Sequence, residues 1–171
     1  MAAKKFLRNI AGKVSEVVGI ITSAGAGNDG DLIVLDAGGK LDITLFPAGM
    51  GENSLSVATT ENLAVGDFVN MHDSTGIKLR KADAGSNNFE AHGWVESAST
   101  SPAANTIFFF GTNSVLSGLS VGVQYYLDAA TAGLITSTAP SGSNEMVQRI
   151  GISHSATELV VLLGQPIILS A

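Results

Sequence analysis

An internal repeat in the last two thirds of the chain constrains its fold more than any other sequence feature. The matching segments, in order along the chain, are Leu63–Gly66 with Leu119–Gly122, Gly85–Asn87 with Gly142–Asn144, and Ile107–Gly111 with Val160–Gly164. An ordered series of matches at a spacing of about fifty-five residues is typical of a duplicated supersecondary unit. The sequence therefore predicts two similar units, about residues 63–117 and 119–170.

Each copy has the pattern of short strands separated by glycine-containing turns. Ile77 and Leu79 alternate with Lys78 and Arg80, as expected for a half-buried strand. The runs 108–110 and 160–163 are apolar at every position, which predicts strands that are central or covered by another chain. The sequence thus predicts an all-β protein in which residues 51–171 form a body. Two copies would together close a barrel or sandwich, which removes exposed sheet edges.

Residues 1–50 precede the repeat and have a different pattern. Apolar runs at 5–10 and 14–20 flank a glycine-containing loop and predict a hairpin. The runs 32–36 and 40–45 flank Ala37-Gly38-Gly39 and predict a second hairpin. Two isolated hairpins are marginally stable in water, so residues 1–50 are expected to form an extended arm that packs against a partner.

The charge of the chain is divided unevenly. Residues 1–13 carry four basic residues and no acid, a charge of +4, whereas residues 14–171 carry five bases and fifteen acids, a charge of −10. An acidic body argues against nucleic acid as the main partner. A basic first segment is consistent with an arm that docks on an acidic surface, or with cations that only keep a terminal hairpin soluble. The expected contact residues are Lys4, Lys5, Phe6, Arg8 and Lys13.

No motif in the chain predicts catalysis, a cofactor or a metal. Residues 25–30 have the spelling Gly-x-Gly-x-x-Gly, but β-branched and apolar residues follow where a dinucleotide site needs a helix. His72, His92 and His154 lack local metal-ligand spacing, cysteine is absent, and there is no Gly-x-Ser-x-Gly element. No run approaches the roughly 20 apolar residues of a membrane-spanning helix. We therefore expect neither an enzyme nor a membrane-spanning protein.

The segments Lys4–Lys13, Leu35–Asp42 and Phe46–Gly51 resemble the start of small structural proteins of tailed bacteriophages. The stretch Val121–Asp128, with Gly133–Thr136, is similar to β-modules of phage head-decoration and fibre proteins. The resemblance implies a virion component on the capsid exterior, assembled in the host cytoplasm, most plausibly a capsid decoration (cement) protein. Such proteins are commonly homotrimers that bridge neighbouring major capsid proteins, and they have no catalytic residues to transfer.

Two other functions are consistent with the sequence. A head or tail fibre adaptor would display a receptor-binding or glycan-binding surface, and solvent-exposed aromatic side chains would distinguish it. A small hydrolase acting on polysaccharide would need carboxylates that converge from distant parts of the chain. Aromatic residues such as Tyr125 and Tyr126 are more often buried in a core or a subunit interface than stacked on a sugar.

Overall fold

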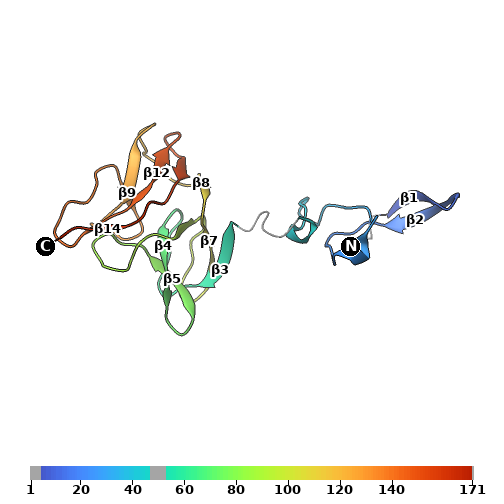
Figure 1. Ribbon diagram of the computed structural model, residues 1–171, viewed down its shortest axis with the longest axis horizontal. Coiled ribbons are helices and arrows are strands. Elements are labelled where there is room, and N and C mark those ends of the chain that lie inside the picture. The colour runs from blue at the N-terminus through green and yellow to red at the C-terminus, as the bar shows by residue number, and fades with distance from the viewer. Residues whose placement is uncertain (1–4, 47–52, 171) are drawn as a thin grey trace. The chain divides into compact units, whose positions relative to one another are not determined.

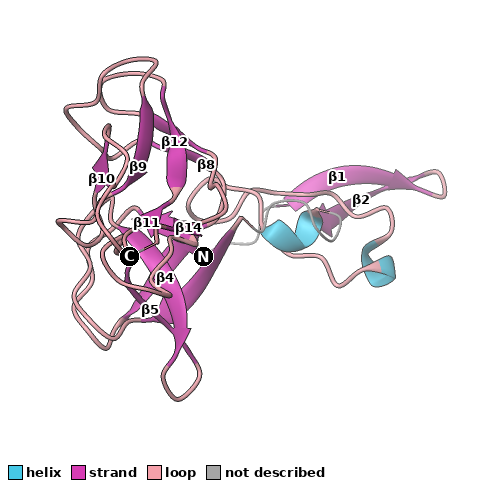
Figure 2. Ribbon diagram, turned by 60° about the vertical axis from the view of Figure 1, so that its left-hand side comes forward, coloured by secondary structure: helices cyan, strands magenta, loops and turns pink. Residues whose placement is uncertain are grey.

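A computed structural model describes residues 5–46 and 53–170, which belong to two compact units that divide between residues 52 and 53. Strands are the main regular elements of both units, as Figures 1 and 2 show, and the described helices are two 3-10 turns of three residues each. No helix in the described part of the chain is both long and apolar enough to cross a membrane. The prediction of an all-β protein is therefore confirmed.

The first unit begins with the predicted hairpin. Strand β1 (Lys5–Ile10) pairs antiparallel with β2 (Lys13–Val18) along its whole length. Ala11 and Gly12 connect them with φ angles of 53° and 83°. Positive φ at both central residues is the geometry of the two-residue turn that matches the twist of a hairpin.

The second predicted hairpin, at residues 32–36 and 40–45, is wrong. Ile33 forms only an isolated parallel bridge with Ile20, and Ile43–Leu45 is the 3-10 helix η2. Aspartates redirect the backbone here. The Asp36 carboxylate accepts hydrogen bonds from the N–H groups of Gly38 (2.8 Å) and Lys40 (2.9 Å). Asp42 accepts one from the N–H of Thr44. Such local bonds compete with strand pairing.

The second unit contains two five-stranded antiparallel sheets. The first sheet has the order β3 (Ser54–Ala58), β7 (Ala104–Phe108), β6 (Gly93–Val95), β4 (Phe68–Asp73) and β5 (Ile77–Lys81). The second has the order β8 (Gly111–Asn113), β13 (Leu159–Val161), β12 (Arg149–Ser153), β9 (Gln124–Leu127) and β10 (Ile135–Thr136). A two-stranded sheet pairs β11 (Met146–Val147) with β14 (Ile167–Ile168).

The two large sheets share one topology. In each, the strand that comes first along the chain forms one edge, followed across the sheet by the fifth, fourth, second and third of its five strands. The first sheet curls, because a single parallel bridge from Thr59 to Leu79 links the end of β3 to the opposite edge. Neither sheet closes into a barrel within residues 53–170, so the closure expected from the sequence is not observed.

The first sheet is buried on both faces. Phe68 and Trp94 point to one face, whereas their neighbours Val69 and Val95 point to the other, as strand alternation requires. One buried cluster lies on the Val69 side and consists of Val57, Leu63, Val69, Leu79, Val95 and Ile107. The other cluster joins both sheets and contains Phe68, Ala82, Ala84, Ala91, Trp94, Tyr125, Leu127, Met146, Ile150, Leu159 and Val161.

The apolar runs of the sequence are less buried than expected. Strand β7 ends at Phe108, and Phe110 is 63% exposed, with its N–H donated to the Asn53 side chain. In the second copy Leu162 is 47% exposed. Burial on both faces within the chain is therefore not observed at these positions, because the chain turns at residues 109–111 and one face of the second sheet is partly exposed. Coverage by another chain stays a prediction.

Replacing Gly93 with alanine should destabilise the body strongly. A Cβ atom there would lie 2.1 Å from the Phe108 carbonyl oxygen and 2.7 Å from Cγ1 of Ile107. Two paired strands would have to separate, so we expect a loss of at least about 2 kcal/mol in the free energy of unfolding. Urea unfolding followed by Trp94 fluorescence measures it. Gly27→Ala, in open space, is the control, and equal stability of the two variants would contradict the close strand contact.

Candidate functional site

The ionisable side chains of the body lie in separate small groups. His154 Nδ1 lies 3.1 Å from Glu158, and His92 Nε2 lies 3.4 Å from Glu90. Across residues 5–46 and 53–170, no three His, Asp or Glu side chains are grouped so as to hold a metal ion. The loop at 25–30 contains the 3-10 helix η1 (Ala26–Asn28), which is too short to present a phosphate-binding N-terminus.

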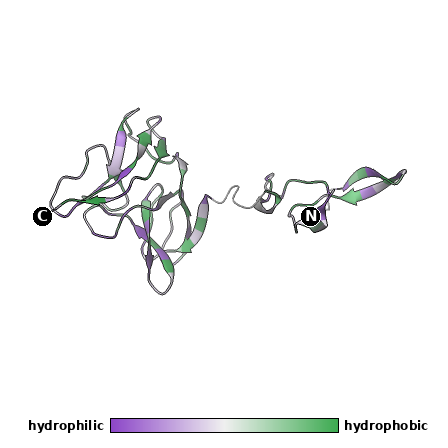
Figure 3. Cartoon of the chain, in the orientation of Figure 1, coloured by the Kyte–Doolittle hydropathy of each residue, from purple (hydrophilic) through white to green (hydrophobic). Residues whose placement is uncertain are grey.

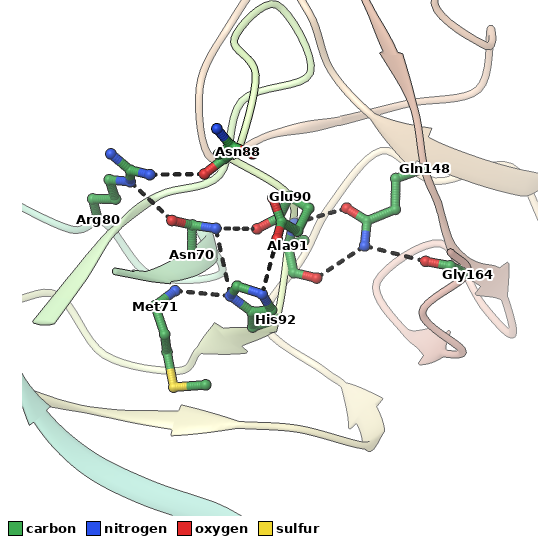
Figure 4. A network of polar contacts seen from close by, with 9 residues as sticks. All are labelled: Asn70, Met71, Arg80, Asn88, Glu90, Ala91, His92, Gln148 and Gly164. Atoms are coloured by element: carbon green, nitrogen blue, oxygen red, sulfur yellow. Dashed lines mark hydrogen bonds and ion pairs between the residues drawn. The ribbon is translucent and has the colours of Figure 1, made fainter. Parts of the chain in front are cut away.

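A polar network of the body centres on Asn70, which is almost fully buried (Figure 4). Its side-chain oxygen accepts a hydrogen bond from Arg80 Nε at 2.8 Å, and its nitrogen donates to the Glu90 carbonyl oxygen at 2.8 Å. Arg80 also donates to the carbonyl oxygen of Asn88 and lies 3.3 Å from the centre of the Phe89 ring. The contacts with Asn88, Phe89 and Glu90 hold the loop 83–92 against the face of the first sheet that carries Asn70.

His92 is held in one orientation by the same network (Figure 4). Its Nδ1 accepts a hydrogen bond from the backbone N–H of Met71 at 2.9 Å, so the ring proton is on Nε2 in the neutral form. That nitrogen faces the Glu90 carboxylate. No hydroxyl or thiol nucleophile takes part in these contacts, so the arrangement positions backbone and does not resemble a catalytic triad.

Gln148 connects the two halves of the body through its buried amide. The side-chain oxygen accepts from the Ala91 N–H at 2.7 Å, and the nitrogen donates to the Ala91 carbonyl at 2.9 Å. The same nitrogen donates to the Gly164 carbonyl at 3.3 Å. The amide therefore satisfies both backbone groups of Ala91 as a neighbouring strand would. This network is a structural link between the two halves of the body.

An apolar hollow of about 320 Å³ lies where the two halves meet. Its lining contains no charged side chain and includes Val65, Phe68, Val115, Leu134 and Ile135. Val65 and Leu134 are about half exposed at this surface. Such a lining fits an aliphatic side chain of a partner better than a charged ligand.

The predicted contact residues of the first unit have varied surroundings. Lys4 lies outside the described residues. Lys5 Nζ lies 3.2 Å from Glu16 Oε1 across the hairpin, and Arg8 Nη1 donates to the Gly30 carbonyl at 2.7 Å. Phe6 approaches the backbone of Gly19, and Lys13 is exposed at the turn. The structure therefore uses Lys5 and Arg8 in contacts within the unit, on opposite faces of β1.

One face of the hairpin presents exposed aliphatic side chains beside Lys5, Asn9 and Glu16, and this face was not predicted from the sequence. Leu7 is 77% exposed and Val14 is 70% exposed, and strand register places both on one face with Val18. Figure 3 shows the alternation of hydropathy along these two strands. Strand pairing sets Leu7 opposite Glu16 and Val14 opposite Asn9, so the aliphatic side chains of this face are interspersed with polar ones. Hydropathy along the sequence therefore does not reveal them as one surface.

Comparison with known proteins assigns no family to the chain. No protein-family model matches the sequence, and no curated protein matches it significantly. The candidate site therefore rests on geometry. It consists of apolar surfaces on both units, and its chemistry is that of protein contact.

Replacing Gln148 with leucine should destabilise the body by about 2–4 kcal/mol, because two buried backbone groups of Ala91 lose their partners. Urea unfolding monitored by Trp94 fluorescence measures the change. Gln165→Leu is the matched control, because the Gln165 side chain is exposed beside the same network. Equal midpoints for the two variants would show that the amide link does not hold the halves together.

The stability of the protein should fall as pH drops below about 6.5, in part because of His72. Burial lowers the pKa of His72, and the Arg80 guanidinium lowers this pKa further. Because the unfolded chain then binds a proton at a higher pH than the folded chain, protonation favours unfolding. His72→Gln should give a shallower decrease in unfolding free energy between about pH 7 and pH 5.5 than the wild type.

The control for this measurement is His154→Gln, since the His154 side chain is exposed. Urea titrations at each pH give the unfolding free energies. A decrease in His72→Gln as steep as in the wild type would rule out His72 as a source of the pH dependence.

Proposed function

We propose that this protein is a virion structural protein that binds the outside of a phage capsid and stabilises the head by bridging major capsid proteins. The observation that carries the proposal is the lack of a core in the first unit. Of the side chains described in residues 5–46, Val34 alone is buried. A segment that buries so little of its own surface needs a partner surface for a stable conformation.

The composition of the exposed hairpin face supports docking on protein. Leu7, Val14 and Val18 share one face, on which Glu16 lies between Val14 and Val18 and Lys5 lies opposite Val18. Burial of apolar area contributes roughly 25 cal/mol per Å². Several copies on one shell would add avidity, which raises the apparent affinity without any new contact. The two open edges of the hairpin also offer backbone groups to a strand of the partner.

We further infer that the second unit arose by duplication and forms the protruding body, with self-association into a homotrimer. The shared strand order of the two sheets supports duplication. Corresponding turns agree in detail: Gly66 and Gly122 both have positive φ, and the N–H groups of Asp67 and Val123 donate to Ala64 and Ser120. Matched turns in matched topologies are expected of copies of one unit.

A fibre or adaptor role is the second candidate, favoured by one observation. Phe110 is a large aromatic residue that is mostly exposed beside the β8 edge of the second sheet. An exposed aromatic ring is a common platform for a sugar. Affinity of the purified protein for cell-surface glycans, lost in Phe110→Ala, would support this role over capsid binding.

Capsid binding is tested with heads that lack the protein. Leu7→Asp combined with Val14→Asp should weaken binding to such heads by roughly tenfold or more, because both charges would have to be desolvated in the contact. Co-sedimentation with heads measures binding, and release of DNA under mechanical or thermal stress measures stabilisation. Val121→Asp, an exposed valine of the body, is the matched control. Wild-type protein that neither sediments with heads nor retards DNA release would overturn the proposal.

A further inference from the structure

The two large sheets differ in how their equivalent outer faces are covered. In the first sheet this face carries the cross-strand row Phe68, Trp94 and Phe108. Phe68 and Trp94 are at most 1% exposed, because they pack in the cluster shared with the second sheet. The Trp94 and Phe108 rings stack with centroids 5.7 Å apart. One copy thus covers this face of the other.

The same row in the second sheet is open. In the first sheet, Phe68 lies opposite Trp94, which lies opposite Phe108. In the second sheet the corresponding row is Gln124, Ile152 and Val160, in the same order across the strands. We define the outer face of the second sheet by the row and its neighbours on the same side: Thr112, Gln124, Tyr126, Ile152, Val160 and Leu162. Ile152 is 38% exposed, and none of the six is buried.

The central strands of this face are aliphatic. An antiparallel sheet that faces water normally presents polar side chains on that side. Here β12 and β13 present Ile152 and Val160, and Leu162 follows directly after β13. The face therefore has the composition of a covered surface, although Ile152 and Leu162 remain exposed within the described residues 53–170.

The charge of the face indicates which partner covers it. At the ends of this face lie one basic residue, Arg149, and one acidic residue, Glu158, which pairs with His154. These formal charges cancel, whereas residues 53–170 carry four bases and nine acids, a net charge of −5. Two acidic bodies repel each other, and this repulsion is weakest where each presents a surface without net charge. The neutral face is therefore suited to contact with a second copy of the chain.

We propose that the outer face of the second sheet binds the same face of another copy of this chain, so that Ile152 and Val160 of neighbouring copies lie at the symmetry axis. Three such faces can surround a threefold axis, where their aliphatic side chains would be removed from water. This contact would cover the second sheet as the second copy covers the first sheet within the chain. The proposal deepens the proposed function, because it names the surface through which copies associate.

Sedimentation equilibrium of the full chain over a range of concentrations tests the contact in the absence of heads. The wild type should have the mass of three chains. Ile152→Glu should weaken association at least tenfold, because it places like charges opposite each other in a surface without water. Ile77→Glu, at an isoleucine of the first sheet that is 59% exposed, should associate as the wild type does. A monomeric wild type, or equal association of both variants, would overturn the proposal.

A second measurement does not depend on tolerance of a buried charge. The chain has no cysteine, so Leu162→Cys creates a single reactive thiol on the face. A short bismaleimide should link Leu162→Cys chains to each other and leave the Ile77→Cys control unlinked. Absence of linkage at position 162 would contradict the contact.

Head binding is measured separately, which distinguishes failure of this inference from failure of the proposed function. A monomeric wild type that still sediments with heads would overturn only the contact between copies. The wild type could instead be monomeric in solution and bind heads, while Ile152→Glu does not bind them. That result would show that the face binds the capsid, and the inference would be wrong.

Discussion

The buried cluster shared by the two sheets is the contact on which the rest of the body depends. Phe68 and Trp94 contribute from the first sheet, and Leu127, Ile150 and Leu159 contribute from the second, all with almost no exposed surface. Because each copy is only about fifty-five residues long, it is near the lower limit of size for an independent core. The second sheet has no enclosed cluster of its own, so its stability depends on the outer face of the first.

Much of this architecture could be predicted from the sequence, because turns are encoded locally. Glycine is placed where a positive φ is required, at Gly66, Gly76, Gly122 and Gly133, and these residues mark the start of corresponding strands. The edge strands 54–58 and 111–113 were missed, because both are short, the second is polar, and their pairing partners are distant in the sequence. Similarly, the carboxylates of Asp36 and Asp42 capture backbone N–H groups, a competition that hydropathy cannot reveal.

The contact residues of the hairpin illustrate a different limit of sequence reasoning. Charge alone pointed to Lys5 and Arg8, yet one pairs with Glu16 and the other bonds the Gly30 carbonyl. Whether a side chain of the hairpin is exposed depends on which face of the hairpin packs against residues 19–34. Contacts such as that of Phe6 with Gly19 determine which face this is. The shared face of Leu7, Val14 and Val18 therefore became visible only with the strand register and the accessible surface in place.

Register also explains why the two copies of the body have different surroundings. The sequence alignment set Ile107 against Val160, but pairing with Trp94 and Ile152 makes Phe108 the counterpart of Val160. A slip of one residue exchanges the two faces of a strand, and runs that are apolar at every position conceal it. With the corrected register, an aromatic face that is covered in the first copy corresponds to an aliphatic face that is open in the second. If the two halves arose by duplication, as we infer, one face serves packing within the chain and its counterpart is open for the contact between chains that we propose.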